Sequence, residues 1–320
     1  MEQQAAYRQP GEAIAGLTPI PQHPALLHLV ESLRQRHAGC VQAILFYGSC
    51  LRSGDPYDGL VDLYLLVDNY RCANSSRSRA VWNWLLPPNV FYAEFPHDER
   101  KIRCKYAVLS LADLEKGTSK RWFHSYLWGR FSQPTAIAWC SDEQARQRVE
   151  NSLAQAVLTF LNRALPALPA QGSVQALWRD GLQLSYAAEL RVESGARTRE
   201  LSESGKAYYQ QVTQLSATLL DYPLTFSDQA QDAHYQTRIP SWRRLVSRIG
   251  WKLRSVQGKL LSLARLIKAL FTFDGGLDYI AWKLERHSGV HIEIPDRVRR
   301  YPLIFVWGMF WDLYRRGVFR

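Results

Sequence analysis

The chain has 320 residues, of which 47% are apolar, and it carries a net charge of +11. This length can bury more than one hydrophobic core, so we expect two domains or one domain with a tail. The charge is uneven, because residues 238–320 hold 17 Lys and Arg against 6 Asp and Glu, whereas residues 1–237 hold 23 of each. Such a basic end is typical of a segment that faces a polyanion, either nucleic acid or an anionic membrane.

Cysteine spacing and hydropathy argue against several classes of protein. The five cysteines form no Cys-x-x-Cys pair and have no histidine at ligand spacing. We therefore expect neither a zinc site nor a disulfide framework, and we expect a reducing compartment. The first residues include Glu2 and Glu12 and have no apolar core, unlike a signal peptide. The apolar stretch at residues 301–311 is shorter than the roughly 20 residues that a membrane-spanning helix needs, so no span is expected.

Periodicity predicts the first elements in chain order. A helix near the N-terminus is predicted from apolar residues on one helical face, namely Leu26, Leu27, Leu29, Val30 and Leu33. Two runs rich in β-branched and aromatic residues, at 41–47 and 60–67, predict strands. Alternation over residues 90–95 and again over 102–108 predicts a hairpin.

Helical spacing dominates the middle of the chain. Ser141 and Gln144 have the spacing of a capping box, and the helical pattern that follows continues to Tyr209. The prolines and the glycine within residues 166–172 divide this region into two long predicted helices.

The most informative pattern is a Gly-Ser turn after an apolar run, followed by a carboxylate. Gly48 and Ser49 end the first predicted strand, and Asp62 begins the second, thirteen residues after the serine. Glycine lets the backbone approach a phosphate, serine adds a hydroxyl donor, and Mg²⁺ prefers carboxylate oxygens. The layout is typical of a nucleotidyltransferase site that binds a triphosphate. On spacing alone, an ordinary turn and a solvated aspartate are the alternative interpretation.

Further motifs agree with this pattern in order along the chain. They are Tyr47-Gly48-Ser49 with Val61-Asp62-Leu63; Lys105-Tyr106-Ala107-Val108-Leu109-Ser110; Gly129-Arg130 with Pro134; Leu184-Ser185-Tyr186-Ala187 with Glu189-Leu190-Arg191; and Lys268-Ala269-Leu270-Phe271-Thr272 followed by Tyr279, Ala281 and Lys283. Together they resemble the mitochondrial-type phosphatidate cytidylyltransferases, the family of the mitochondrial translocator assembly and maintenance protein. The resemblance extends from about residue 41 to about residue 286.

The resemblance implies a reaction and a set of site residues. A phosphatidate cytidylyltransferase converts CTP and phosphatidic acid into CDP-diacylglycerol and pyrophosphate by Mg²⁺-assisted in-line transfer, in phospholipid biosynthesis. By resemblance, Asp62 holds the metal and Lys105 is the second catalytic residue. The implied substrate and nucleotide contacts are Tyr47, Gly48, Ser49, Arg130, Tyr186, Arg191 and Lys268.

The fold class expected from these patterns is α+β. A nucleotidyltransferase-type mixed sheet with helices is expected in residues 1–140, and a helical domain that completes the active-site cleft in residues 141–237. Residues 238–320 are expected to form a basic amphipathic helical region that associates with a membrane.

The chain also departs from the family pattern. It has Cys50 and Ala107 where the family commonly has glycine, and Gln133 where lysine is common. Three of the basic residues named above, Lys105, Arg130 and Arg191, can also be explained by structural roles alone. Lys105 suits a strand residue whose amine reaches solvent, Arg130 suits the C-terminal end of a helix, and Arg191 suits an ion pair with a glutamate on its own helix.

The second metal ligand is the least determined part of the site. Nucleotidyltransferases generally carry an Asp-x-Asp pair, and here Tyr64 stands where the second aspartate would be. We predict Asp58 as the second ligand of the metal beside Asp62, with Asp55 and Glu94 as further candidates.

The basic region has the pattern of a helix in a membrane interface. Basic and apolar residues alternate from Trp242 to Lys268, so one helical face is cationic and one apolar, although an apolar stripe is otherwise the core side of a helix. Predicted aromatic and basic anchors are Trp282, Trp307, Phe310 and Trp311 beside Arg299, Arg300, Arg315 and Arg316. We expect a peripheral protein on the cytoplasmic face of a bacterial inner membrane, or on the matrix face of the mitochondrial inner membrane.

Two other functions remain open on sequence. A nucleotidyltransferase acting on RNA, or on another phosphate or hydroxyl acceptor, would use the same catalytic end, but RNA-binding tails place stacking aromatics among polar residues, and no nucleic-acid partner is expected here. A catalytically inactive membrane-binding module would explain Tyr64.

Overall fold

The fold was analysed in a computed structural model of the chain. It describes residues 8–37, 39–74, 76–189, 195–227, 233–272, 294–300 and 308. Two helices, α2 (Arg8–Gly16) and α3 (Pro24–Arg36), precede the main sheet. The predicted anchors Trp282, Trp307, Phe310, Trp311, Arg315 and Arg316 lie outside the described residues.

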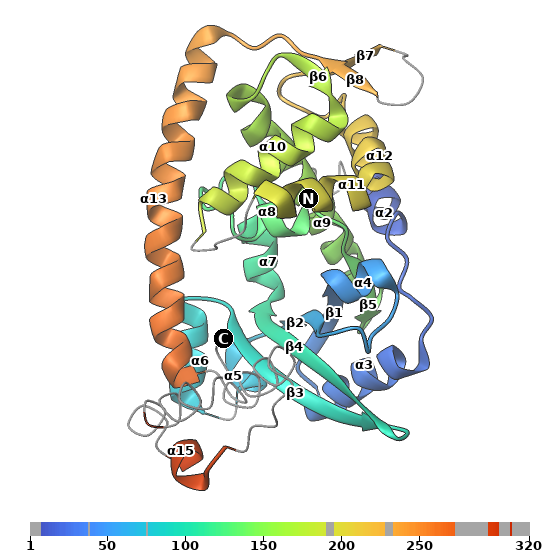
Figure 1. The fold of residues 1–320 in the computed structure, drawn as a ribbon, viewed down its shortest axis with the longest axis vertical. Coiled ribbons are helices and arrows are strands. Elements are labelled where there is room, and N and C mark those ends of the chain that lie inside the picture. Colours follow the sequence, from blue (N-terminus) through green and yellow to red (C-terminus); the bar gives the residue numbers. More distant parts are fainter. Residues whose placement is uncertain are drawn as a thin grey trace.

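A five-stranded mixed sheet forms the centre of the first half (Figure 1). Its strands, in the order β3-β4-β2-β1-β5, are β3 (Asn89–His97), β4 (Arg100–Ser110), β2 (Val61–Val67), β1 (Val41–Tyr47) and β5 (Ala136–Cys140). β2 and β4 run parallel, and the other neighbours run antiparallel. The mixed sheet with its many helices confirms the α+β fold class, and the predicted strands and hairpin are confirmed.

Helices surround the sheet and continue beyond it. They are α4 (Ser49–Ser53), α5 (Tyr70–Ala73), α6 (Arg77–Leu85), α7 (Leu111–Thr118), α8 (Trp128–Phe131), α9 (Glu143–Ala164), α10 (Val174–Ala187), α11 (Gly195–Ser204), α12 (Lys206–Ser216), α13 (Ser241–Thr272) and α15 (Asp296–Arg300). A small sheet of β6 (Gln171–Ser173), β8 (His234–Gln236) and β7 (Thr225–Ser227) lies beyond α10. This small sheet had no signal in the sequence.

The two faces of the main sheet belong to two apolar cores, because successive side chains of a strand point to opposite faces. On one face Tyr64 belongs to a core with Trp128 and Phe160, which lie on helices α8 and α9. On the other face Leu63 belongs to a core with Leu29 of α3. The first core runs from the sheet into the helices of residues 141–237 without a break at residue 140.

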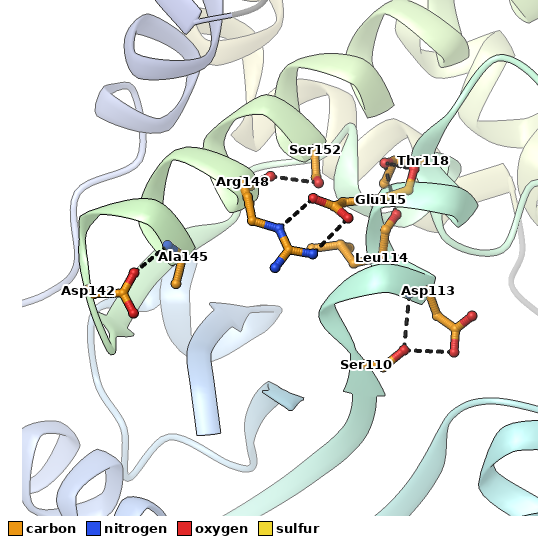
Figure 2. A network of polar contacts seen from close by, with 9 residues as sticks. All are labelled: Ser110, Asp113, Leu114, Glu115, Thr118, Asp142, Ala145, Arg148 and Ser152. Carbon is orange, nitrogen blue, oxygen red and sulfur yellow. Dashed lines mark hydrogen bonds and ion pairs between the residues drawn. The ribbon is translucent and has the colours of Figure 1, made fainter. Parts of the chain in front are cut away.

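Polar contacts hold α7 and α9 against the end of β4 (Figure 2). Ser110 caps α7, because its Oγ accepts a hydrogen bond from the backbone N–H of Asp113. Arg148 of α9 donates two hydrogen bonds to the carboxylate of Glu115 on α7, at 2.7 and 2.9 Å. A two-point guanidinium–carboxylate pair fixes orientation as well as distance. These contacts hold the end of the strand that carries Lys105.

Three sequence predictions about local structure are wrong. Leu27 lies on the exposed side of α3, because the buried stripe is formed by its neighbours at helical spacing. The cap of α9 is Asp142, which accepts from the N–H of Ala145, so the Ser141 capping box does not form. The region to Tyr209 holds four helices instead of two, and Gly205 separates the last pair.

The structure also contains a disulfide bond that the cysteine spacing did not predict. Cys40 and Cys72 are paired, with their Cα atoms 5.7 Å apart. The reason is topological: Cys40 precedes β1, Cys72 lies on α5 just after β2, and antiparallel pairing brings Val41 opposite Val67. The two cysteines are 32 residues apart in sequence, so no local pattern predicts that they lie close together.

Helix α13 runs along one side of the molecule, from the small sheet to α6 (Figure 1). Its inner face is held by Trp251, which belongs to the first apolar core, and by Gly258, which packs on the backbone of Ala188. Among the described residues, no helix has both the length and the hydropathy of a membrane-crossing segment.

Candidate functional site

Three neighbouring strands bring the central residues of the predicted site together. In the sheet register, Tyr47 at the end of β1 lies opposite Asp62 at the start of β2, and Asp62 lies beside Lys105 of β4. Lys105 Nζ is 3.0 Å from Asp62 Oδ1 as an ion pair. Asp62 Oδ1 is buried and makes no aligned hydrogen bond among the described residues, so the contact with Lys105 is electrostatic.

The turn after β1 requires glycine for two reasons. Gly48 has φ of 92°, in the left-handed region that L side chains rarely adopt. A Cβ at this position would lie 2.8 Å from Asp62 Oδ2. The backbone of the turn therefore passes directly over the carboxylate of Asp62. This is expected where backbone N–H groups and a carboxylate face the same ligand.

Cys50 follows the turn as a buried thiol. Its thiol is buried and donates to the carbonyl of Leu60 at 3.3 Å. Burial, with Asp62 nearby, raises the pKa of the Cys50 thiol to about 11, so it is protonated at neutral pH. A protonated buried thiol is a packing group, which explains how the position tolerates the departure from glycine.

A cavity of about 670 Å³ opens at this edge of the sheet, within the range of small-molecule sites. Its lining includes these predicted site residues: Tyr47, Gly48, Ser49, Asp62, Lys105, Arg130 and Tyr186. They come from β1, α4, β2, β4, α8 and α10. The fold thus collects residues that are up to about 140 positions apart in sequence.

Arg130 forms the cationic wall of the cavity. Its guanidinium carbon lies 5.3 Å from the ring centre of Tyr47 and 5.4 Å from that of Tyr126. Its Nε is buried and has no hydrogen-bond partner among the described residues. Burial opposes the charge, but the oxygens of Tyr64, Tyr47 and Tyr126, with Glu189, raise the pKa of Arg130 above its ordinary value. Arg130 is therefore a permanent cation with an unused donor.

Tyr64 stands where the sequence pattern leads one to expect a second aspartate. Tyr64 is fully buried, packs against Phe131 and donates its hydroxyl hydrogen to Tyr126 at 3.3 Å. Burial raises the pKa of Tyr64, and it raises that of Tyr47 to about 12 with Asp62 contributing. Neither phenol ionises near neutral pH, so neither supplies an anionic metal ligand.

Gln133 is positioned where the family commonly has lysine. Its Oε1 accepts a hydrogen bond from the Tyr186 hydroxyl at 3.0 Å, and its Nε2 donates to the carbonyl of Gly129 at 2.9 Å. Both ends of the amide are therefore occupied, and Gln133 orients Tyr186 at the cavity wall.

Several lining residues were not predicted. Arg52 of α4 lies three positions after Ser49, on the same helical face, and this spacing was the available signal. Thr18, Pro19, Ser204, Gly205, Tyr208 and Tyr209 also line the cavity. They belong to loops and helices whose approach to the sheet is decided by tertiary packing, so no local pattern marks them.

Lys268 is not part of the cavity lining. Its Nζ donates to the carbonyl oxygens of Leu86 and Pro88, at 2.6 and 2.7 Å. Burial, with Arg265 nearby, lowers the pKa of Lys268 to about 7. The structure does not bring Lys268 to the cavity with the other predicted contacts, because its amine holds the end of α13 against residues 86–88. Arg191 lies outside the described residues.

The structure also keeps the other candidate carboxylates out of the cavity. Asp58 is exposed on the turn before β2, and Asp55 is exposed and accepts from the N–H of Tyr57. Glu94 lies on the outer part of the hairpin and forms an ion pair with Arg103, whose Nε is 3.1 Å from Glu94 Oε1. The prediction of Asp58 as a metal ligand is therefore not met by this geometry, because strand pairing carries Asp62 alone to the edge.

Asp62 is the one acidic side chain among the described residues that line the cavity. No group of three potential metal-binding side chains occurs in the described part of the chain. Mg²⁺ is commonly bound through one or two carboxylates with the remaining positions filled by substrate phosphates and water. The buried Oδ1 of Asp62, which has no hydrogen-bond partner among the described residues and an ion pair with Lys105, fits such a single-carboxylate arrangement.

Comparison with known proteins adds little to this geometry. No family model and no curated protein matches the chain. A solved structure of a nucleotidyltransferase-like protein from Exiguobacterium sibiricum 255-15 is similar over 67% of this chain and 100% of that one, with 6% sequence identity and a TM-score of 0.27. A likeness at this level carries no argument about function, so the interpretation depends on the residues of the cavity.

Proposed function

We propose that the chain is a phosphatidate cytidylyltransferase, a nucleotidyltransferase that joins the cytidylyl group of CTP to the phosphate of phosphatidate. The observation that carries the proposal is the meeting of the Gly48-Ser49 turn, Asp62, Lys105 and Arg130 in one cavity. A backbone turn, one carboxylate and several cations are the groups that a metal-bound triphosphate requires.

The cavity residues suggest how the triphosphate is held. Its oxygens would lie against the turn at Gly48 and Ser49, with Lys105, Arg130 and Arg52 balancing its charge. Mg²⁺, held by Asp62, would supply further charge neutralisation at the phosphates when bound. The Asp62–Lys105 ion pair keeps both side chains aimed at this position before the nucleotide arrives.

The composition of the cavity favours a phosphate acceptor over a hydroxyl acceptor. A lipid phosphate oxygen attacks the α-phosphorus of CTP, the bond to the β-phosphate oxygen breaks, and pyrophosphate leaves. The attacking phosphate is already ionised, so no general base is needed. Among the described lining residues there is no histidine, and the one carboxylate is paired with Lys105. A hydroxyl acceptor such as the end of an RNA would need a base there.

The outward apolar face of α13 supports a lipid substrate. Its exposed large apolar residues are between 46% and 63% accessible, and they are Trp242, Leu245, Val246, Ile249, Leu253, Val256, Leu260, Leu263, Leu266 and Ile267. The opposite face donates hydrogen bonds to carbonyl oxygens of the body, from Arg244, Trp251, Arg254 and Ser255. The apolar stripe is therefore not the core side of the helix.

Charge indicates what the apolar face of α13 meets. The helix carries eight Lys and Arg and no Asp or Glu, and four of the basic residues are exposed, namely Arg243, Arg248, Lys252 and Lys259. Contact with the same helix of a second copy would bring like charges together, whereas an anionic membrane complements them. A helix of 32 residues is about 48 Å long and can lie in an interface over that length. A peripheral enzyme in this position meets a substrate that stays in the bilayer.

The test is pyrophosphate release by the purified full chain. We expect release that requires CTP, phosphatidate vesicles and Mg²⁺ together, with CDP-diacylglycerol formed in equal amount. The other nucleoside triphosphates, vesicles without phosphatidate, and an RNA acceptor serve as controls. Release with RNA and CTP would identify an RNA nucleotidyltransferase instead. No release with any acceptor, from a chain that binds vesicles, would identify an inactive membrane-binding module.

A further inference from the structure

Helix α6 exposes an apolar surface that the catalytic cavity does not use. Val81, Trp82, Trp84 and Leu85 are between 47% and 68% accessible on this helix of nine residues. Its inner side is formed by Ala80 and Asn83, which are buried. Trp82 and Trp84 are two positions apart, so they flank Val81 and Leu85 on the outer side of the helix. An exposed apolar patch of this kind marks an interaction site.

The end of α6 is joined to the end of α13. Lys268 donates to the carbonyls of Leu86 and Pro88, which directly follow α6, and Arg265 Nε donates to the carbonyl of Pro87 at 3.2 Å. α6 lies beside the C-terminal half of α13 in Figure 1. α6 is therefore fixed beside the C-terminal part of α13, the helix that carries the outward apolar face.

Basic residues also lie on α6. The helix carries Arg77 and Arg79 and no acidic residue, while Asp68 and Asp113 line a groove on one side of it, together with Arg77, Val81 and Trp84. No acidic residue occurs from Arg238 to Thr272. Both surfaces thus combine exposed apolar side chains with positive charge, which complements anionic lipid and repels a second copy of the same surface.

We propose that α6 is a second membrane-contacting element, which inserts Trp82 and Trp84 into the same anionic lipid interface that receives α13. The inference depends on the membrane attachment included in the proposed function, and it assigns part of that attachment to residues 1–140. Indole rings suit this depth because they are apolar with one N–H donor. A single interfacial helix leaves the body able to rotate about the helix axis. A second contact beside it removes this rotation and fixes the catalytic cavity relative to the bilayer.

The test compares the full chain with Trp82→Ser/Trp84→Ser. Binding to phosphatidylcholine vesicles containing phosphatidate is measured by sedimentation, without nucleotide. We expect at least about tenfold weaker binding, because each aromatic side chain removed from the apolar layer loses a sizeable transfer free energy. Leu27→Ser is the matched control, since Leu27 is an exposed apolar helix residue on α3, away from α13 (Figure 1). This control should bind as the parent does.

A second measurement reports insertion directly. Vesicles with brominated acyl chains should quench tryptophan fluorescence of the parent, and the double variant should lose part of that quenching. Equal binding and equal quenching in parent and double variant would overturn the inference. So would a dimer of the parent, seen without lipid by ultracentrifugation, that the double variant abolishes. Binding and quenching are measured without nucleotide. The membrane inference can therefore be tested even if the cytidylyltransferase assay shows no activity.

Discussion

Gly48 illustrates how single residues set the site. Position 48 requires glycine for two independent reasons. The backbone has a positive φ, and a Cβ would lie 2.8 Å from Asp62 Oδ2. The same residue therefore shapes the turn and leaves space for the carboxylate. Asp62, in turn, is the acidic residue that strand pairing carries to the cavity, and Arg130 is the cation that contacts the rings of Tyr47 and Tyr126.

We expect Gly48→Ala to reduce both stability and activity, and Gly54→Ala to reduce stability alone. Both glycines have positive φ, so each substitution costs about 1–2 kcal/mol of backbone strain. Only at Gly48 does the new methyl group meet another residue, whereas nothing lies within 4 Å at Gly54. Thermal unfolding and pyrophosphate release from CTP measure the two effects. Equal activity of the two variants would show that Asp62 has not been displaced.

Asp62→Asn should remove most of the activity while Asp58→Asn leaves it near the parental level. Asp62 lies in the cavity, and Asp58 is exposed outside it. The loss of stability in Asp62→Asn should stay below about 1 kcal/mol, because the ion pair with Lys105 is partly solvated. Turnover of Asp62→Asn within about tenfold of the parent, a barrier change of about 1.4 kcal/mol, would contradict the assignment.

At the scale of elements, α13 reverses the usual amphipathic arrangement. A helix on a globular protein normally turns its apolar stripe inward, but here the inner face carries donors, a tryptophan and a glycine. The cationic side chains Arg244, Arg254, Arg265 and Lys268 bind carbonyl oxygens of the body. α13 is therefore attached by directed polar contacts and close backbone approach.

Gly258→Ala should weaken the attachment of α13. A Cβ at Gly258 would lie 1.9 Å from the carbonyl oxygen of Ala188, so the helix must move away. We expect a loss of about 1–3 kcal/mol in the free energy of unfolding. Gly250→Ala is the matched control on the same helix, where nothing lies within 4 Å and alanine favours helix. Urea unfolding of both variants decides the question, and equal stabilisation would contradict the close approach.

The contact between Lys268 and residues 86–88 should depend on pH. Burial lowers the pKa of Lys268 from 10.5 to about 7, so between these values the unfolded state binds a proton that the folded state has lost. This contribution to stability therefore rises with pH from about 7 to 10.5, by at most about 1.4 kcal/mol per pH unit. Lys268→Met has no such group. The difference in unfolding free energy between parent and Lys268→Met should rise over that range, and a constant difference would refute the shift.

At the scale of the whole molecule, exposed apolar residues lie on two helices that contact each other, α6 and α13. The net charge of +11 comes from residues 238–320 of the sequence. Because α13 also supplies Trp251 to the main core, deleting the helix would remove membrane contact and packing together. Substitutions on its outer face separate the two effects.

Vesicle binding should weaken as salt concentration rises but should not vanish. Basic residues near an anionic surface contribute on the order of 1 kcal/mol each and are screened over roughly 8–10 Å. Apolar insertion is insensitive to this screening. Lys252→Gln/Lys259→Gln should flatten the salt dependence, because both residues are exposed on α13. The control pair Arg100→Gln/Lys101→Gln, at the tip of the hairpin, should leave it unchanged. If both double substitutions changed the salt dependence of vesicle binding equally, net charge alone would control binding.

The local parts of the fold and the site were determined by the sequence. Residues 41–47, 60–67 and the hairpin follow from alternation and turn residues, since these patterns depend on neighbours in the chain. The Gly48-Ser49 turn and Asp62 could be recognised for the same reason. Even Arg52 had a signal in its spacing from Ser49.

Only the tertiary structure decided which distant residues meet. Arg130 and Tyr186 reach the cavity through the packing of α8 and α10, and Cys72 reaches Cys40 through strand pairing. Periodicity shows that α13 has an apolar face. Whether that face points inward or outward depends on which side of the helix packs against the rest of the molecule. Helical spacing is a property of one segment, whereas burial is a property of the assembled chain. The outward apolar face of α13 could therefore be read only from the fold.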